Sequence, residues 1–212
     1  QLAVVEAGAA GLAFFVAASA LKSAEPLMPG MNVLVTGAGG GVGGAVIGLA
    51  KASGARTIGV VRGAENASAA IAQGADVVID IAAEDLEEGI RSATVDRGLS
   101  LIVDSVGPPL VNQTLPMLET GGQLRLLTAP QGGTLEIDVL DFYRRALTFA
   151  GINTLRSEVV AIAGILRGVV PAIRDGYLKA PRVSKTIPIS QAGEAYATVH
   201  AGGHQGRVVL VP

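Results

Sequence analysis

Short apolar runs rich in β-branched residues alternate with amphipathic segments along most of the chain. Six runs have the length and the glycine, proline or polar boundaries of strands: Val33–Thr36, Thr57–Val61, Val77–Asp80, Leu101–Asp104, Leu124–Thr128 and Leu147–Ile152. The segments between them favour helices at Val42–Ser53, Ala64–Gln73, Glu84–Ala93 and Pro109–Leu118, whereas Gly132–Arg145 is expected to be mostly loop. Apolar strands that alternate with helices predict an α/β fold whose parallel sheet is buried on both faces.

The alternation ends after the sixth run. A helical stretch at Ser157–Tyr177 is followed by a proline-punctuated extended segment at Pro181–Pro188, a helix at Ser190–Ala201 and a last strand at Arg207–Val211. We therefore expect a first domain at 1–180, which begins with a lead-in helix, and a return segment at 181–212 that belongs to another layer.

The uncharged run from Val33 to Ala50 could form a membrane helix or a loop that holds a ligand. Its glycines cluster between Gly37 and Gly44, and each would cost about 1 kcal/mol in a helix relative to alanine. A β-branched run precedes the cluster and a helix-compatible run follows it. This order predicts a strand, a tight turn and a helix, in which glycine permits positive φ and lets a diphosphate approach the backbone.

The glycine turn can be aligned with the dinucleotide-binding fingerprint in two frames, as Gly39/Gly41/Gly44 or as Ala38/Gly40/Gly43. Amides at the start of the following helix would face the diphosphate, with the positive end of the helix dipole behind them. Together with the alternating pattern, the turn predicts a Rossmann-type doubly wound parallel sheet of about six strands.

Arg62 follows the second predicted strand, where sites that prefer NAD place an acidic residue against the ribose. A guanidinium there can pair with a 2′-phosphate, a contact worth roughly 1.5–3 kcal/mol. NADP(H) is therefore favoured over NAD(H). Arg62 could instead be a solvated loop charge or stack on adenine, and the nearby Glu65 keeps NAD(H) as the alternative.

Composition narrows the classes of partner. The chain of 212 residues has 16 basic and 18 acidic residues and no basic stripe, so a nucleic-acid surface is not expected. It has no cysteine, which excludes disulfides and a thiolate nucleophile. The segment Leu2–Leu21 is long enough to span a membrane, but it carries Glu6 and is mostly alanine and glycine, so we expect a buried helix of a globular domain.

Seven stretches carry a family resemblance in the same order along the chain: "AAGLAFFVAASAL", "LMPGMNVLVTGAGGGVGGAVIGLAKASGA", "AQGADVVID", "LIVDSVG", "LETGGQLRLL", "LTFAGINT" and "GRVVLVP". The chain resembles the C-terminal, cofactor-binding portion of a medium-chain dehydrogenase/reductase of the zinc-independent quinone oxidoreductase type. The resemblance implies a homodimer, joined through the Rossmann sheet, that uses NADPH to reduce quinones or α,β-unsaturated carbonyls by hydride transfer. A cytoplasmic location is expected, since a chain without cysteine fits a reducing compartment.

The same resemblance implies a GroES-like N-terminal domain outside these residues, against which the return segment at 181–212 would pack. The residues that polarise the acceptor belong to that domain, so the catalytic residues are not identified and the fragment alone is expected to be inactive. Two alternatives remain open: an enoyl-thioester reductase domain, free-standing or in a polyketide synthase, and a dinucleotide-binding sensor or subunit without chemistry.

Cofactor-binding residues follow from the resemblance position by position: Gly39, Gly40, Gly41 and Val42 at the diphosphate, Arg62 at the 2′-phosphate, and Ser105 and Leu127 along the path from adenine to nicotinamide. Leu127 is equally compatible with a core position. Asn66 stands where the family often has a lysine, and Ala13 replaces a threonine near the nicotinamide.

No metal site is expected. Ala10 lies about where zinc-dependent relatives place a cysteine ligand. His200 and His204 are spaced like two zinc ligands on a helix, but glycines lie between them and no third ligand is close.

Overall fold

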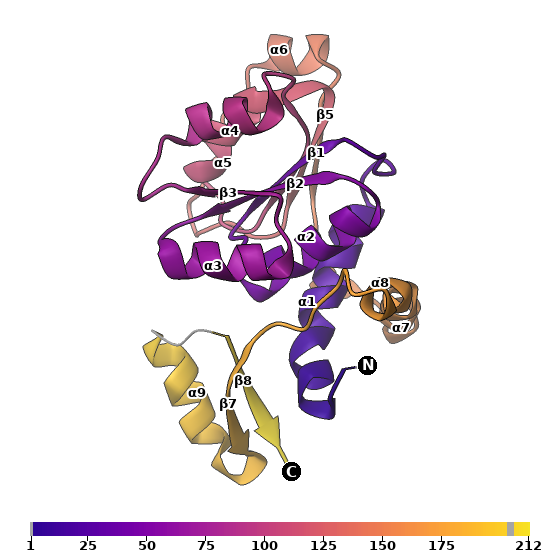
Figure 1. Cartoon of the computed structure of the whole chain (residues 1–212), viewed down its shortest axis with the longest axis vertical. Coiled ribbons are helices and arrows are strands. Elements are labelled where there is room, and N and C mark those ends of the chain that lie inside the picture. Colours follow the sequence, from indigo (N-terminus) through magenta and orange to yellow (C-terminus); the bar gives the residue numbers. More distant parts are fainter. Residues whose placement is uncertain (1, 203–205) are drawn as a thin grey trace.

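A six-stranded parallel sheet forms the centre of the molecule, whose computed structural model describes residues 2–202 and 206–212 (Figure 1). Its strands are β1 Asn32–Thr36, β2 Arg56–Val61, β3 Val77–Asp80, β4 Leu99–Asp104, β5 Leu118–Leu126 and β6 Thr148–Gly151. They lie in the order β3-β2-β1-β4-β5-β6, and every neighbouring pair is parallel. This order is that of a Rossmann fold and confirms the predicted fold class.

Helices cover both faces of the sheet, because successive side chains of a strand point to opposite sides. In β1, Val33 and Val35 pack with α1 Val4–Lys22 and α2 Gly41–Ala52, whereas Leu34 packs with α4 Leu86–Thr94 and α5 Leu110–Thr114. The helix α3 Ala64–Gln73 lies on the same face as α2 (Figure 1). The sheet is therefore buried on both sides, as its continuous apolar runs predict.

Most elements differ from the sequence prediction by one or a few residues at an end, and three differences are larger. The strand β5 begins at Leu118 rather than Leu124, because Leu118 already pairs with Leu99 of β4; residues 119–122 form an irregularity before regular pairing resumes at Gln123. The helical stretch 157–177 is divided into α7 Val159–Gly168 and α8 Val170–Arg174, with Pro171, which has no N–H to donate, at the start of the second helix. The expected loop 132–145 contains a short helix, α6 Val139–Arg144.

The apolar N-terminal segment forms one helix, α1, as predicted. By length and composition α1 could cross a membrane; its second half is buried against the core through Ala13, Phe14 and Ala17. Its C-terminal end is held by the buried Arg125, which donates to the carbonyl of Ser23 at 2.8 Å and to the hydroxyl of Ser23 at 3.1 Å.

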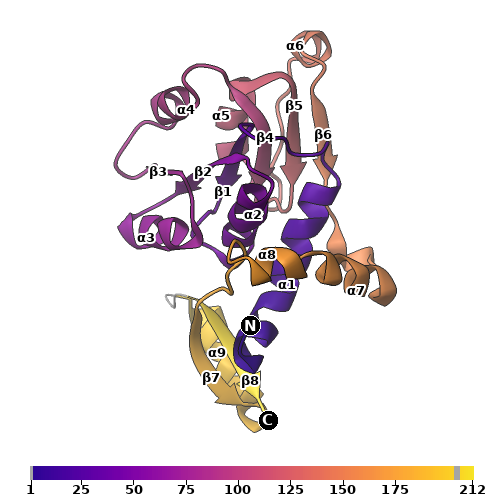
Figure 2. The same cartoon turned by 45° about the vertical axis from the view of Figure 1, so that its right-hand side comes forward.

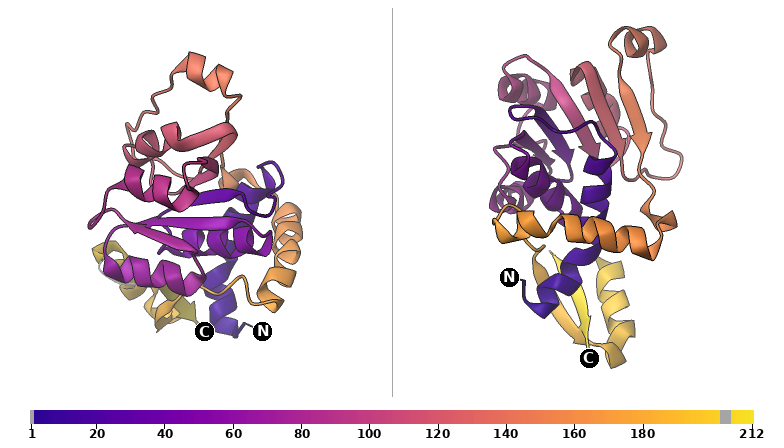
Figure 3. Two further views of the ribbon diagram at one scale, coloured as in Figure 1. Left: turned by 45° about the horizontal axis from the view of Figure 1, so that its top comes forward. Right: turned by 90° about the vertical axis from the view of Figure 1, so that its right-hand side faces the viewer.

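The return segment forms a second, smaller sheet. The strands β7 Val183–Pro188 and β8 Arg207–Val211 pair in parallel, and α9 Ala192–Ala201 packs against them. This unit lies beyond the first half of α1, at the opposite end of the molecule from α6, while α7 and α8 run across α1 (Figures 2 and 3). One consequence is that residues near the C-terminus approach the start of α2.

Candidate functional site

The site is centred where the strand order reverses. From β1 the chain moves outward through β2 and β3, and then returns to place β4 on the other side of β1. In open parallel sheets a ligand binds at the carboxyl ends of the two strands that flank such a reversal. The predicted glycine turn starts at this point, directly after Thr36.

The glycine turn presents unpaired amides. Gly37 has φ of +64°, which favours glycine, and the amide of Gly40 donates to the carbonyl of Gly37 at 2.9 Å. Gly40 is the N-cap residue of α2, and no side chain caps the helix. The amides of Gly41, Val42 and Gly43 therefore have no partner within the helix and lie at the positive end of its dipole.

The structure distinguishes the two frames of the fingerprint. A Cβ on Gly43 would lie 2.4 Å from the carbonyl oxygen of Gly37, a backbone atom that cannot move away cheaply. A Cβ on Gly44 would meet the flexible side chain of Gln73 instead. The glycine needed for close packing of helix against strand is thus Gly43, which favours the Ala38/Gly40/Gly43 frame.

A first cavity, called the Arg62 cavity, has a volume of about 530 Å³ and extends from the turn across the ends of β2 and β3. Gly37 and Arg62 line it, and Val61, Val106 and Leu110 give it apolar walls. This combination of apolar walls and a few polar groups is typical of small-molecule sites.

Asp80 fixes the turn that carries Arg62. It accepts a hydrogen bond from the amide of Gly63 at 2.7 Å and one from the amide of Ala82 at 3.0 Å. These amide bonds, with the positive charge of Arg62 as a smaller cause, hold the pKa of Asp80 below its ordinary value. The side chain of Arg62 itself is exposed.

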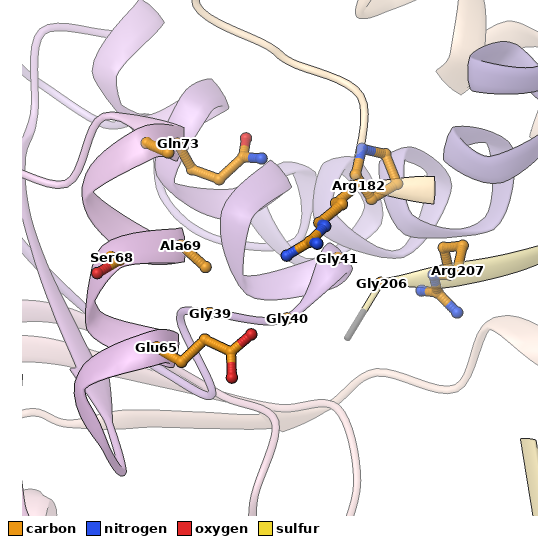
Figure 4. Close-up of a pocket in the computed structure, with 12 residues that line it drawn as sticks. Gly39, Gly40, Gly41, Glu65, Ser68, Ala69, Gln73, Arg182, Gly206 and Arg207 are labelled. Carbon is orange, nitrogen blue, oxygen red and sulfur yellow. The ribbon is translucent and has the colours of Figure 1, made fainter. Parts of the chain in front are cut away.

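A second cavity, called the two-arginine cavity, lies on the other side of the turn and has a volume of about 480 Å³. Figure 4 shows α3 on one side, with Glu65, Ser68, Ala69 and Gln73, and Arg182, Gly206 and Arg207 on the other, with Gly39–Gly41 between them. The guanidinium of Arg207 lies 3.0 Å from the position that a Cβ on Gly41 would occupy, so this arginine lies directly against the start of α2.

Arg182 and Arg207 are the site residues that the sequence did not indicate. They lie far along the chain from the turn, and the pairing of β7 with β8 brings them together: the amide of Arg207 donates to the carbonyl of Arg182 at 2.7 Å. Among the described residues, Arg62, Arg182 and Arg207 form no ion pair. The two cavities beside the turn are therefore lined by three arginines, none of which is bonded to a carboxylate of the described residues.

The other predicted positions lie close to the turn but outside these two cavities. Ser105 donates its hydroxyl to the carbonyl of Thr36 at 2.8 Å. Leu127 is partly buried against the core, and the side chain of Val42 packs there as well. Val42 can therefore contribute to the site through its unpaired amide at the start of α2, but not through its side chain.

The described residues do not fit a zinc ion. They contain no group of three or more histidine, cysteine, aspartate or glutamate side chains that could hold a metal. Ala10 is buried against the core, and His204, one of the two spaced histidines, lies outside the described residues.

A Rossmann sheet with a glycine turn at its reversal point defines a dinucleotide-binding protein. The chain belongs to the family described as zinc-binding dehydrogenases, whose model matches residues 41–164. Despite that description, the chain has no cysteine and its described residues provide no zinc site.

Individual relatives agree with this assignment and confirm the resemblance to quinone oxidoreductases. Quinone oxidoreductase of Rattus norvegicus is 27% identical over 210 residues, which cover 97% of this chain and 62% of the relative. A reducing polyketide synthase of Hypomyces subiculosus is 29% identical over 87% of this chain and 8% of its own length. A mycobacterial protein solved in complex with NADPH superposes with a TM-score of 0.81 at 26% identity, over 100% of this chain and 65% of its own.

Proposed function

We propose that this chain binds NADP(H) and forms the cofactor-binding part of a reductase of quinones or α,β-unsaturated carbonyls. The observation that carries the proposal is the start of α2, where unpaired amides lie between two cavities that together hold three arginines. The NADPH-bound relative supports the choice of cofactor.

The parts of the cofactor correspond to the parts of the site. The diphosphate would accept hydrogen bonds from the unpaired amides of Gly41, Val42 and Gly43, and the adenosine would occupy the Arg62 cavity, between its apolar walls. Arg62 would pair with the 2′-phosphate, and Arg207 with the diphosphate. Because Asn66 stands in place of a lysine, these arginines are the cations available to the phosphates.

Bound NADPH supplies a hydride from its nicotinamide ring to the acceptor. This chain's own share is to bind the dinucleotide, hold its phosphates and orient the ring along the ends of β4 and β5, beside Ser105 and Leu127. The chain spans 62% of the length of the rat relative. We assign polarisation of the acceptor to a GroES-like domain outside these residues and expect no turnover from this chain alone.

The division of the chain at residue 180 follows from the same proposal. Residues 1–180 form the dinucleotide-binding domain, and 181–212 form the segment that returns to the other domain. The exposed faces of β7 and β8 support this assignment, since most of their side chains are only partly buried or exposed.

We assign the active form to a cytoplasmic homodimer joined along the edge strand β6. Its open edge and the exposed Val139, Leu140 and Tyr143 of α6 support this assignment. Light scattering coupled to size exclusion would give twice the chain mass; a monomer at all concentrations would contradict it.

The match to a polyketide synthase favours a second candidate, an enoyl-thioester reductase. The two candidates share this cofactor site and differ in the acceptor. Turnover of acyl thioesters by the full-length protein, with no turnover of quinones, would select the second.

Titration with NADPH and with NADH tests the cofactor assignment. Arg62→Ala should weaken NADPH by roughly tenfold or more, the equivalent of a charge-assisted contact, and leave NADH nearly unchanged. Arg97→Ala is the control, because Arg97 is also exposed but precedes β4, at the opposite end of the sheet. Equal weakening of both cofactors by Arg62→Ala would contradict the 2′-phosphate assignment.

A further inference from the structure

A carboxylate is fully buried at the point where the strand order reverses. Asp104, the last residue of β4, has no exposed surface. It accepts hydrogen bonds from the hydroxyl of Thr36 at 2.6 Å and from the amides of Gly107 at 2.6 Å and Val106 at 3.3 Å. Its partners are thus neutral donors, and among the described residues no cation forms an ion pair with it.

Thr36 connects the buried carboxylate of Asp104 to the glycine turn. Its hydroxyl oxygen also accepts from the amide of Ser105 at 3.0 Å, and its carbonyl accepts from the hydroxyl of Ser105 at 2.8 Å. Both the side chain and the carbonyl of the last residue of β1 are therefore fixed from β4. The next residue along the chain is Gly37, where the turn begins.

Ser105 also lies directly against that turn. A Cβ on Gly37 would lie only 2.6 Å from the hydroxyl oxygen of Ser105, and Gly37 has the positive φ that sets the direction of the chain toward α2. The turn therefore rests on the hydrogen-bonded network, and a change in the network alters where the amides of α2 point.

Stability alone does not account for this arrangement. Burial of a carboxylate costs free energy, and replacing both partners of a buried hydrogen bond by apolar groups of the same shape can leave stability nearly unchanged. The negative charge would also repel a diphosphate bound nearby. The network instead defines one geometry of the turn, because buried polar groups that must all form hydrogen bonds allow few other conformations.

We propose that Thr36, Asp104 and Ser105 are positioning residues that hold the glycine turn in the conformation that receives the dinucleotide's diphosphate. They act on the diphosphate through the backbone of Gly37 rather than by contact with the diphosphate itself. The inference rests on the proposed function and gives Ser105 a role different from the one the sequence predicted. Because the diphosphate is common to both cofactors, the network affects NADPH and NADH alike.

Thr36→Val removes the hydroxyl and keeps the shape, and Thr57→Val is its matched control. Thr57 is buried on the neighbouring strand and donates its hydroxyl to Asp76 at 2.9 Å, but at the amino end of the sheet. By calorimetric titration, Thr36→Val should weaken NADPH and NADH by about tenfold each, whereas Thr57→Val should change both less than twofold. Thr36→Ser, which keeps the hydroxyl, should restore binding.

If Thr36→Val does not fold, Ser105→Ala takes its place and should weaken both cofactors in the same way. Equal dissociation constants for the two valine variants, with changes only in melting temperature, would overturn the inference. A loss confined to NADPH would also overturn it, because the network would then act on the 2′-phosphate.

Amide hydrogen exchange without ligand separates this inference from the proposed function. Thr36→Val should accelerate exchange of the hydrogen-bonded amides of the turn, those of Ala38, Gly40 and Gly44, by at least about tenfold, and Thr57→Val should not. If the wild-type protein binds neither cofactor, the proposed function is wrong. The exchange rates of the turn amides still show whether the network holds the turn. Unchanged exchange in Thr36→Val would overturn that role.

Discussion

The two ends of the central sheet carry the same kind of contact in different surroundings. At the carboxyl end, Thr36 on β1 bonds to Asp104, which is fully buried and bonded to neutral donors. At the amino end, Thr57 on β2 bonds to Asp76, whose side chain is 35% exposed and pairs with Lys51 at 2.5 Å. A buried carboxylate bonded to neutral donors defines a conformation, whereas a partly exposed one paired with a cation adds a small increment of stability.

The difference corresponds to what each end does. The carboxyl end has a glycine turn, two cavities and three arginines around one helix start. At the amino end, Asp76 connects α2 to β2, because it accepts hydrogen bonds from Lys51 of α2 and from Thr57 of β2. We therefore expect substitutions at the first end to change ligand affinity and substitutions at the second to change stability.

The largest expected effect is at Gly43. Gly43→Ala places a Cβ against the backbone of Gly37 and displaces the turn, at a cost of about 1–3 kcal/mol, which corresponds to roughly tenfold to a hundredfold weaker dinucleotide binding. Gly44→Ala is the control, because its Cβ meets a side chain that can move. Calorimetric titration that found both variants equal to wild type would break the proposed link between turn geometry and affinity.

Arg207→Ala should have the next largest effect. The half-buried guanidinium lies at the start of α2, and loss of a charge-assisted phosphate contact should weaken NADPH and NADH equally, by about tenfold. Arg182→Ala should cost less, since that side chain is exposed. Arg156→Ala, at an exposed arginine that lines neither cavity, serves as the control. If only NADPH bound more weakly, the assignment would be wrong, and Arg207 would pair with the 2′-phosphate instead of the diphosphate.

Asp76→Asn should have the smallest effect and none on binding. Partial burial raises the pKa of Asp76, but hydrogen bonds from Lys51 and Thr57, with the positive charge of Lys51, outweigh it and lower the pKa below 3.8. Because the pKa of Asp76 is lower in the folded state than in the unfolded state, its ionised form stabilises the fold at neutral pH. This stabilisation is lost as the pH falls from about 3.8, the ordinary value, through the lower pKa of the folded state.

At pH 7 the Asn variant should therefore be less stable by about 0.2–1 kcal/mol, as expected for a partly exposed pair. Urea unfolding should show the difference shrinking in acid, with unchanged affinity for either cofactor. A difference that grew as the pH fell would contradict the lowered pKa.

The sequence was sufficient for the sheet because each strand is a short apolar run with its own boundaries. The strand β3 and the helix α3 begin and end where predicted. The start of β5 was missed because Gly121 and Gly122 interrupt the apolar pattern, while pairing with β4 and β6 determines where a strand runs. The local pattern of apolar and polar residues thus predicted which helices and strands exist better than it predicted where they begin and end.

The candidate site divides in the same way. The glycine turn and Arg62 are recognisable because a strand, a turn and a helix follow one another in the chain. Arg182 and Arg207 were missed since only the pairing of β7 with β8 brings them to the turn. The hydrogen bonds between Ser105 and Thr36 were not predicted, because they join strands that are far apart in sequence.

Titration of isotopically labelled protein with NADPH, followed through the backbone amides, tests the assignment of the diphosphate most directly. Saturable shifts should be largest for Gly41, Val42 and Gly43, and ADP should reproduce them, because it carries the diphosphate without the nicotinamide. Amides at 41–43 that did not move while others did, or that did not move at all at millimolar NADPH, would contradict the account.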